Sequence, residues 1–379
     1  MLQSFRAGVC RDLRRRAGGA ARHGAGRAVQ QLPATAQRAS GGGSGSALRA
    51  MQIADHAAYL EEVSVLQAQG HPILSPSDRA GLHPLLIPLA SCPAAGGPDA
   101  SAPAGAESVV VGLLRWADPG RHKGMTLPVV SMSRGARGVR LLARSVDEYL
   151  HRILAEEDAA AGSGGTTPLA DAASAAAAVE VAELYPRGAV ERSGLTGPKF
   201  NLYLIKKVGM HPDVAEALSL GHLGRGDATS AMVAGEWYMR NGHFPGWARP
   251  YEFCADLYRK IGKREEECRD VARMALRSPW WTLSSYEDTV AMAQLSGTPE
   301  EVRWILSEEA TAQRTGAVTG LNYKEPRTPV ELAMEEADAV MDMVAGGSLE
   351  GGFDAAREAL AAAYEKAGLI DAANFIRAA

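Results

Sequence analysis

The stretch from Trp237 to Trp281 constrains the fold more than any other part of this chain, because it concentrates the large aromatic side chains. Ten of the 22 aromatic residues, including four of the six Trp, lie between Trp237 and Tyr286. Aromatic side chains bury large areas and dominate both protein cores and interfaces. The rest of the sequence is richer in Ala, Gly and other small residues. This stretch is therefore expected to supply the best-packed part of the core.

The segment 1–50 differs in charge from the rest of the chain. It contains nine Arg, no Lys and one acidic residue, Asp12, whereas 51–379 contains 31 basic and 43 acidic residues. An Arg-rich, acid-poor segment with Ser and Gly is typical of an organellar transit peptide. We predict that 1–50 is a disordered transit peptide, with a disordered basic tail as the alternative. The acidic body argues against nucleic acid as the main partner. No apolar run is long enough to predict membrane insertion.

Residues 51–158 are predicted to form a small α+β unit. A helix beginning after Ser145 has Glu148 at the position that a capping box requires, and it is expected to cover one face of a sheet. Short apolar, β-branched segments separated by turn residues predict the antiparallel meander of that sheet. The predicted strands are 108–116, 126–132 and 138–144.

Two further features belong to this unit or follow it. The segment 82–90 is apolar but contains Pro84 and Pro88, which confine it to an extended or edge position rather than a central strand. The Ala, Gly and Pro-rich segments 93–107 and 159–179 are of low complexity, and we interpret them as a disordered insertion and a linker.

Residues 180–379 show only short helical patterns. Two of their junctions place an aromatic residue before a glycine, Gly262 or Gly368, and then put Ala residues on the returning helix, as in a tetratricopeptide (TPR) hairpin. The predicted fold is therefore mainly α: an irregular TPR-like helical-hairpin solenoid with a small N-terminal α+β unit. The helices are expected at 200–208, 212–222, 227–241, 251–261, 263–276, 284–295, 298–314, 328–344, 353–366 and 369–378.

No motif for catalysis, cofactor binding or metal binding is present in the sequence. The four Cys, at 10, 92, 254 and 268, form no C-x-x-C pair, and there is no H-E-x-x-H. The Gly-rich string at 221–227 does not have the spacing of a phosphate-binding loop. We therefore predict no catalytic, cofactor-binding or metal-binding residue and no cofactor.

The adjacent residues Trp280 and Trp281 are the most unusual local feature, because neighbouring side chains on a helix or strand do not face the same direction. Both core packing and contact with a partner explain them, and Trp is favoured at the centres of protein interfaces. The loop that carries Phe244 and Trp247 has the same two interpretations. We predict Phe244, Trp247, Arg277, Trp280 and Trp281 as partner-binding residues.

Four strings of the sequence resemble a family of plastid-targeted proteins of green algae and plants. They are LHPLLIPLA (82–90), GLLRW (112–116), LLARSVDEYLHRILAEED (141–158) and ALRSPWWTL (275–283). The family includes a proposed assembly factor for the chloroplast ATP synthase. The resemblance implies a soluble stromal protein that binds subunits of the ATP synthase head, and it assigns no catalytic residue to this chain.

The leading hypothesis is a non-enzymatic organellar assembly factor or chaperone that binds protein subunits in the chloroplast stroma, with the mitochondrial matrix as the alternative compartment. A stack of helical hairpins offers the kind of surface that binds protein segments. Two other functions stay open at this point. One is an enzyme with an unrecognised site on the α+β unit, and the other is an RNA-binding helical repeat, which would need a basic groove.

Overall fold

The computed structural model of the chain describes residues 66–67, 69–92, 108–161, 185–240, 242–307 and 327–378. The predicted transit peptide 1–50, the insertion 93–107 and all but the first three residues of the linker 159–179 lie outside these residues.

A four-stranded antiparallel sheet of order β1-β2-β3-β4 forms the α+β unit. The meander predicted from three segments is confirmed, and the proline-containing segment adds a fourth strand at the edge, where its prolines predicted it. Pro88 lies opposite Gly112, beside a register shift between the first two strands. A Cβ atom on Gly112 would clash with the carbonyl oxygen of Ile87, so only glycine allows this close approach. The strands are β1 (Leu86–Cys92), β2 (Val109–Leu114), β3 (Val129–Ser133) and β4 (Arg140–Ala143).

Helix α3 (Val146–Ala161) follows the sheet directly, as the sequence predicts. Its first turn is capped by the Ser145 hydroxyl, which accepts a hydrogen bond from the backbone N–H of Glu148 at 3.2 Å. Leu150, Ile153 and Leu154 are buried and form its apolar face.

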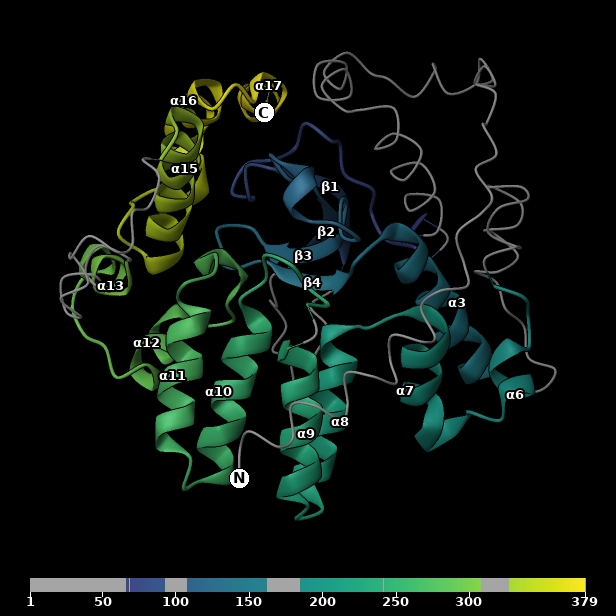
Figure 1. Cartoon of the computed structure of the whole chain (residues 1–379). Helices are drawn as coiled ribbons and strands as arrows, with labels where there is room; N and C mark the ends of the chain where they lie inside the picture. The colour runs from purple at the N-terminus through teal and green to yellow at the C-terminus, as the bar shows by residue number, and fades with distance from the viewer. Residues whose placement is uncertain are drawn as a thin grey trace, which may run out of the picture. The chain divides into compact units, whose positions relative to one another are not determined.

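The rest of the chain is helical, and consecutive helices pack as hairpins: α8 on α9, α10 on α11, and α16 on both α15 and α17 (Figure 1). The elements are η2 (Pro119–Arg121), α6 (Ala189–Ser193), η3 (Gly197–Lys199), α7 (Phe200–Tyr203), η4 (Leu204–Val208), α8 (Pro212–Gly224), α9 (Ala228–Arg240), α10 (Arg249–Ile261), α11 (Glu265–Ala275), η5 (Trp280–Thr282), α12 (Tyr286–Met292), α13 (Pro299–Leu306), α15 (Pro329–Gly346), α16 (Gly352–Lys366) and α17 (Ile370–Arg377).

Local sequence signals explain where several of these helices begin and end. Thr298 and Thr328 each form a capping box with a Glu three residues later, and each is followed by a proline in the first turn. Gly262 and Gly368, the glycines that the sequence places between paired helices, have φ angles of +74° and +78°. These left-handed conformations favour glycine and let the chain reverse directly after a helix.

The prediction of a mainly helical fold with a small antiparallel sheet is thus confirmed, whereas the TPR-like solenoid stays a prediction. A cluster of buried apolar residues extends from the sheet strands through the helices to α17. Among the helices that the described residues form, none is long and apolar enough to span a bilayer.

Candidate functional site

The structure places four of the five predicted partner-binding residues in the core. The exposed fractions of Phe244, Trp247, Trp280 and Trp281 are 5%, 2%, 2% and 6%, whereas Arg277 is exposed. Side chains this deeply buried offer almost no surface to a partner in this conformation. Burial favours the interpretation that the four aromatic residues belong to the core. Of the five predicted partner-binding residues, only Arg277 is exposed at the surface.

Three of the indole rings meet where the sheet joins the helices. Trp116, which follows β2, lies 6.1 Å from Trp247 and 5.9 Å from Trp281 between ring centroids, and Trp247 and Trp281 lie 5.5 Å apart in an edge-to-face arrangement. His122 stacks on Trp116 at 3.5 Å, and His83 lies 4.4 Å from Trp281. We call these five residues the aromatic junction. Some of its rings come from the α+β unit and others from the helical part of the chain. The aromatic junction therefore holds the sheet against the helices.

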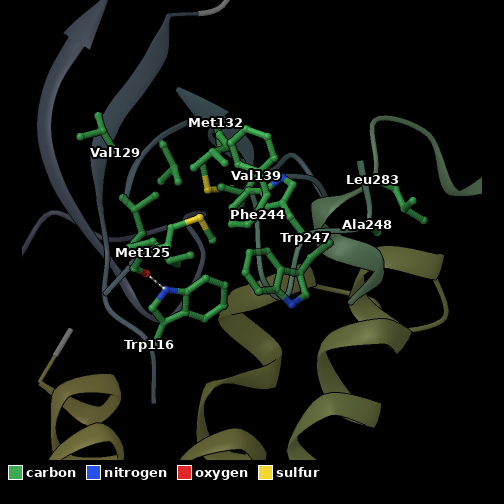
Figure 2. Packing of buried hydrophobic residues seen from close by; sticks show 14 of the residues in the cluster. Trp116, Met125, Val129, Met132, Val139, Phe244, Trp247, Ala248 and Leu283 are labelled. Carbon is green, nitrogen blue, oxygen red and sulfur yellow. Dashed lines mark hydrogen bonds between the residues drawn. The ribbon is translucent and has the colours of Figure 1, made fainter. Parts of the chain in front are cut away.

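Hydrogen bonds satisfy the polar ring nitrogens of Trp116 and His122 in the aromatic junction. The indole N–H of Trp116 donates to the carbonyl oxygen of Met125 at 2.7 Å, which is the dashed line in Figure 2. The Nδ1 atom of His122 lies 3.1 Å from the carbonyl oxygen of Pro245. Buried Trp N–H groups usually require such partners, and Figure 2 shows Trp116 and Trp247 packed among aliphatic and methionine side chains.

The neighbours Trp280 and Trp281 separate because the chain turns as the 3₁₀ helix η5. Trp281 enters the aromatic junction, whereas Trp280 packs on Tyr286 at 4.6 Å. The indole N–H of Trp280 donates to Leu276 O at 2.8 Å, and its backbone N–H donates to Asp342 Oδ1 at 3.0 Å. The two rings therefore fill two different parts of the core.

Backbone contacts fix η5 between the sheet and the helices. The N–H of Val139, directly before β4, donates to Trp281 O at 2.8 Å. The N–H of Ala248, directly before α10, donates to the Thr282 hydroxyl at 2.7 Å. The segment 282–287, which runs from the end of η5 into the first turn of α12, is consequently held at a defined distance from β4, and a space remains between them.

That space is a cleft of about 1250 Å³, which we call the sheet-face cleft. Its floor is one face of the sheet, and its walls are α3, the beginnings of α8 and α10, and the segment 282–287. Trp247 and Trp280 also contribute to its lining although both are buried. Other lining residues are Val109, Val111, Ser131, Ser133, Arg137, Arg140, Leu141, Tyr149, Arg152, Ile153, Glu156, Asp213, Glu216, Arg249, Thr282, Ser284, Ser285 and Glu287.

Arg152 and its carboxylate partners form one wall of the sheet-face cleft. The guanidinium donates to both carboxylate oxygens of Asp213, at 2.8 and 2.6 Å, and to Glu156 at 2.8 Å. Burial alone would raise the pKa of Asp213, but the hydrogen bonds and charge of Arg152 hold it below its ordinary value. The Asp213 carboxylate therefore stays ionised and paired.

Arg249 holds a second set of carboxylates, one on α8 and one on its own helix α10. It donates to both oxygens of Glu216 at 2.8 Å and to Glu252 at 2.9 Å. Burial alone would lower the pKa of Arg249, yet the two carboxylates raise it above its ordinary value. Glu252 is itself buried and accepts hydrogen bonds from the N–H groups of Ser284 and Ser285 at 2.8 and 2.9 Å. This pairing fixes the segment 282–287 to α10.

Two arginines at the mouth of the cleft are paired weakly or not at all. Arg137 lies 3.7 Å from Glu287, and both side chains are more than half exposed. Arg140 is exposed and makes no ion pair with any of the residues that the structure describes. Each wall arginine is paired with two carboxylates, so the walls carry an excess of negative charge. Arg140 is the lining arginine that has no ion pair among the described residues.

His83 is the one buried titratable ring in the aromatic junction. Its Nδ1 atom accepts a hydrogen bond from the N–H of Leu85 at 3.2 Å, which fixes the neutral tautomer. Burial, together with the charges of Arg357 and Arg79, lowers the pKa of His83 to about 3. The ring is therefore neutral at physiological pH.

Sequence reasoning missed the sheet-face cleft because its residues come from distant elements. Arg152 and Asp213 are 61 positions apart, and neither belongs to a recognisable motif. The Gly-punctuated turn that precedes Arg140 was the available signal, since such turns present exposed side chains at the end of a sheet. Among the described residues, no group of three or more His, Cys, Asp or Glu is placed to hold a metal ion.

Three consecutive segments of the chain match models of one protein family. Residues 48–207 match the PAB N-terminal region, residues 212–299 the PAB middle domain and residues 302–379 the PAB C-terminal domain. The chain is also 37% identical, over 316 residues, to an Arabidopsis thaliana protein named "Protein IN CHLOROPLAST ATPASE BIOGENESIS, chloroplastic", and the match covers 83% of this chain and 84% of that protein. This likeness confirms the resemblance that the four sequence strings indicate. No solved structure matches the chain.

Proposed function

We propose that this chain, which belongs to the PAB family, is a non-enzymatic assembly factor that binds unassembled subunits of the chloroplast ATP synthase. The observation that carries the proposal is the 37% identity to the Arabidopsis protein over 84% of that protein's length. The three family matches include the sheet, the aromatic junction and the helical hairpins. In this role the chain binds the subunits directly and acts on them as a chaperone.

The proposed compartment is the chloroplast stroma, with the mitochondrial matrix as the alternative. The name of the Arabidopsis protein and the Arg-rich segment 1–50 support a plastid location. Within this proposal, 1–50 is a transit peptide, 51–158 is the α+β unit, and 180–379 is a TPR-like helical domain that follows the linker 159–179. The proposal includes no cofactor, no nucleic-acid partner and no membrane insertion.

The charges in the sheet-face cleft support binding rather than catalysis. An enzyme on the α+β unit would need polar groups that converge on a reacting centre with pKa values tuned to the reaction. Arg152 and Arg249 instead bind carboxylates of the same chain. An RNA-binding role would need a basic groove, whereas the carboxylates paired with these two arginines outnumber them, so the walls of this cleft are not basic.

Deletion of the gene in its host organism tests the proposed function. Assembled ATP synthase is expected to fall severalfold while other thylakoid complexes keep their levels, and restoring the full-length chain is expected to restore the ATP synthase. The matched measurement is the level of unassembled subunits in the stroma. A deletion strain with normal ATP synthase levels and a normal assembly rate would contradict the proposal.

A further inference from the structure

The size of the sheet-face cleft suits part of a protein better than a small molecule. Pockets for small ligands occupy roughly 300–1,000 Å³ and enclose most of the ligand, whereas this cleft occupies about 1250 Å³. Its mouth is bordered by exposed residues, including Arg137 and Arg140. An open space of this size leaves much of a small ligand in water.

The floor of the cleft is formed by small side chains on one face of the sheet. Val109 pairs with Ser133 and Val111 pairs with Ser131 across β2 and β3. Alternate residues of neighbouring strands share a face, so two apolar and two hydroxyl side chains lie together. Such a floor provides apolar contact and hydrogen-bonding groups without obstructing a polypeptide that lies across it.

The border of the cleft is the outermost strand of the sheet. β4 is bonded to β3 on one side only, because it ends the strand order. His211 Nδ1 lies 3.0 Å from Leu142 O at one end of β4, and the N–H of Val139 donates to Trp281 O at the other end. Between these contacts, Arg140 and Leu141 line the cleft. Outer strands commonly bind extended segments of other chains.

The unneutralised charge at the mouth identifies the chemistry of the segment. Arg140 lies on this outermost strand, with its side chain in solvent and no ion pair among the described residues. The charge of Arg140 contributes to the lowered pKa of Asp213, but that carboxylate is already bound by both terminal nitrogens of Arg152. An arginine in this state favours a carboxylate on an incoming segment.

We infer that the sheet-face cleft binds an extended segment of the partner protein along β4, and that Arg140 pairs with an acidic side chain of that segment. The inference rests on the proposed function for the existence of the partner, and adds the surface and the chemistry of the contact. The charged contact is therefore Arg140 rather than Arg277. The sequence predicts Arg277 as a partner-binding residue, but Arg277 does not line this cleft.

The test measures binding of the full chain to each purified unassembled subunit of the chloroplast ATP synthase. Arg140→Glu is expected to weaken binding of one subunit about tenfold or more, because it places like charges together. Arg277→Glu is the matched control, an exposed arginine outside the cleft, and is expected to leave the affinity unchanged. The affinity of the wild type is also expected to fall as salt is raised.

A second variant tests the floor of the cleft independently of charge. Ser133→Trp places a large side chain over the sheet face and is expected to prevent binding, and its unfolding midpoint shows whether the fold is kept. The inference is overturned if the wild type binds a subunit and Arg140→Glu binds it equally well, or if Arg277→Glu alone loses affinity. If the wild type binds none of the subunits, the result contradicts the proposed function itself. That outcome differs from one in which the wild type binds but the cleft variants bind equally well, which contradicts only the location of the contact.

Discussion

The aromatic junction and the sheet-face cleft lie next to each other, and Trp247 belongs to both, yet the two regions are built from opposite chemistry. In the junction, Trp247 and Trp281 pack edge to face, and the indole N–H of Trp116 donates to a backbone carbonyl oxygen. In the cleft, side chains pair through charge, and its mouth is open to solvent. The aromatic-rich stretch from Trp237 to Trp281 therefore makes the interior rigid and also positions an exposed surface.

The link between the two regions is the short stretch from Trp281 to Ser285. Trp281 is packed in the junction, and three residues later the N–H of Ser284 donates to the buried carboxylate of Glu252. A wall of the cleft is thereby fixed by core contacts. Core variants in this stretch are therefore expected to affect both stability and binding, whereas variants at the mouth are expected to affect binding alone.

The largest effect is expected for Trp281→Ala. Removing a buried Trp from a packed core costs about 3–5 kcal/mol, and the ring that is lost contacts Trp116, Trp247 and His83. Chemical denaturation measures the change. The control is Trp304→Ala, since that ring is 52% exposed and its loss is expected to cost less than about 0.5 kcal/mol. Equal losses in the two variants would remove the distinction between core and surface aromatics.

Glu252→Ala is expected to have the second largest effect, a loss of about 3 kcal/mol, because breaking a buried pair on one side is costly. The substitution leaves the N–H groups of Ser284 and Ser285 without their acceptor and leaves Arg249 with Glu216 as its remaining partner. Glu287→Ala, at an exposed position of the same cleft, is the control and is expected to be nearly neutral. Urea unfolding compares the two, and a neutral Glu252→Ala would show that the cleft wall does not depend on this contact.

The pH dependence of the junction is expected to be intermediate in size. The pKa of His83 is about 3 in the folded chain, below the ordinary 6.5, so its contribution to stability is present above pH 6.5 and is lost as the pH falls towards 3. Between about pH 7.5 and about pH 5 this contribution falls by about 2 kcal/mol. His83→Phe, which keeps a ring but does not titrate, should lose correspondingly less stability over that range. If the free energies of unfolding of the wild type and of His83→Phe changed equally with pH, the buried, neutral state of His83 would be contradicted.

The smallest effect on stability is expected for Arg140→Glu. This side chain is exposed and has no ion pair among the residues that the structure describes. The free energy of unfolding should therefore change by less than about 0.5 kcal/mol, as for other surface substitutions. Urea unfolding of the variant beside the wild type measures this. A large loss would mean that Arg140 supports the fold, and the weaker binding expected of the variant would then have a structural cause.

Local features of the fold could be predicted from the sequence, because their causes lie within a few residues. Examples are the helix starts at 298 and 328, the glycines that end α10 and α16, and the proline-limited edge strand β1. All depend on local conformational preferences. The sequence also places ten of the 22 aromatic residues in one stretch, which the structure shows to be a major part of the core.

The candidate site could not be predicted in the same way. The sequence shows that Trp280 and Trp281 face different directions, but it does not show that both directions lead into the core. That outcome depends on other elements: Trp116 packs near the ring of Trp281, Tyr286 packs on the ring of Trp280, and Asp342 accepts a hydrogen bond from the backbone N–H of Trp280. The sheet-face cleft likewise depends on tertiary packing between the sheet and the beginnings of α8 and α10.

Hydrogen exchange of the chain, alone and with the subunit that it binds, tests most directly the central claim that the junction is internal and the cleft is the docking surface. Bound subunit is expected to slow exchange at residues 133–142, along β4 and the turn before it. The backbone N–H groups around Trp281 should exchange slowly in both states. Protection centred on Arg277 or on α13, with exchange at residues 133–142 unchanged, would contradict this claim.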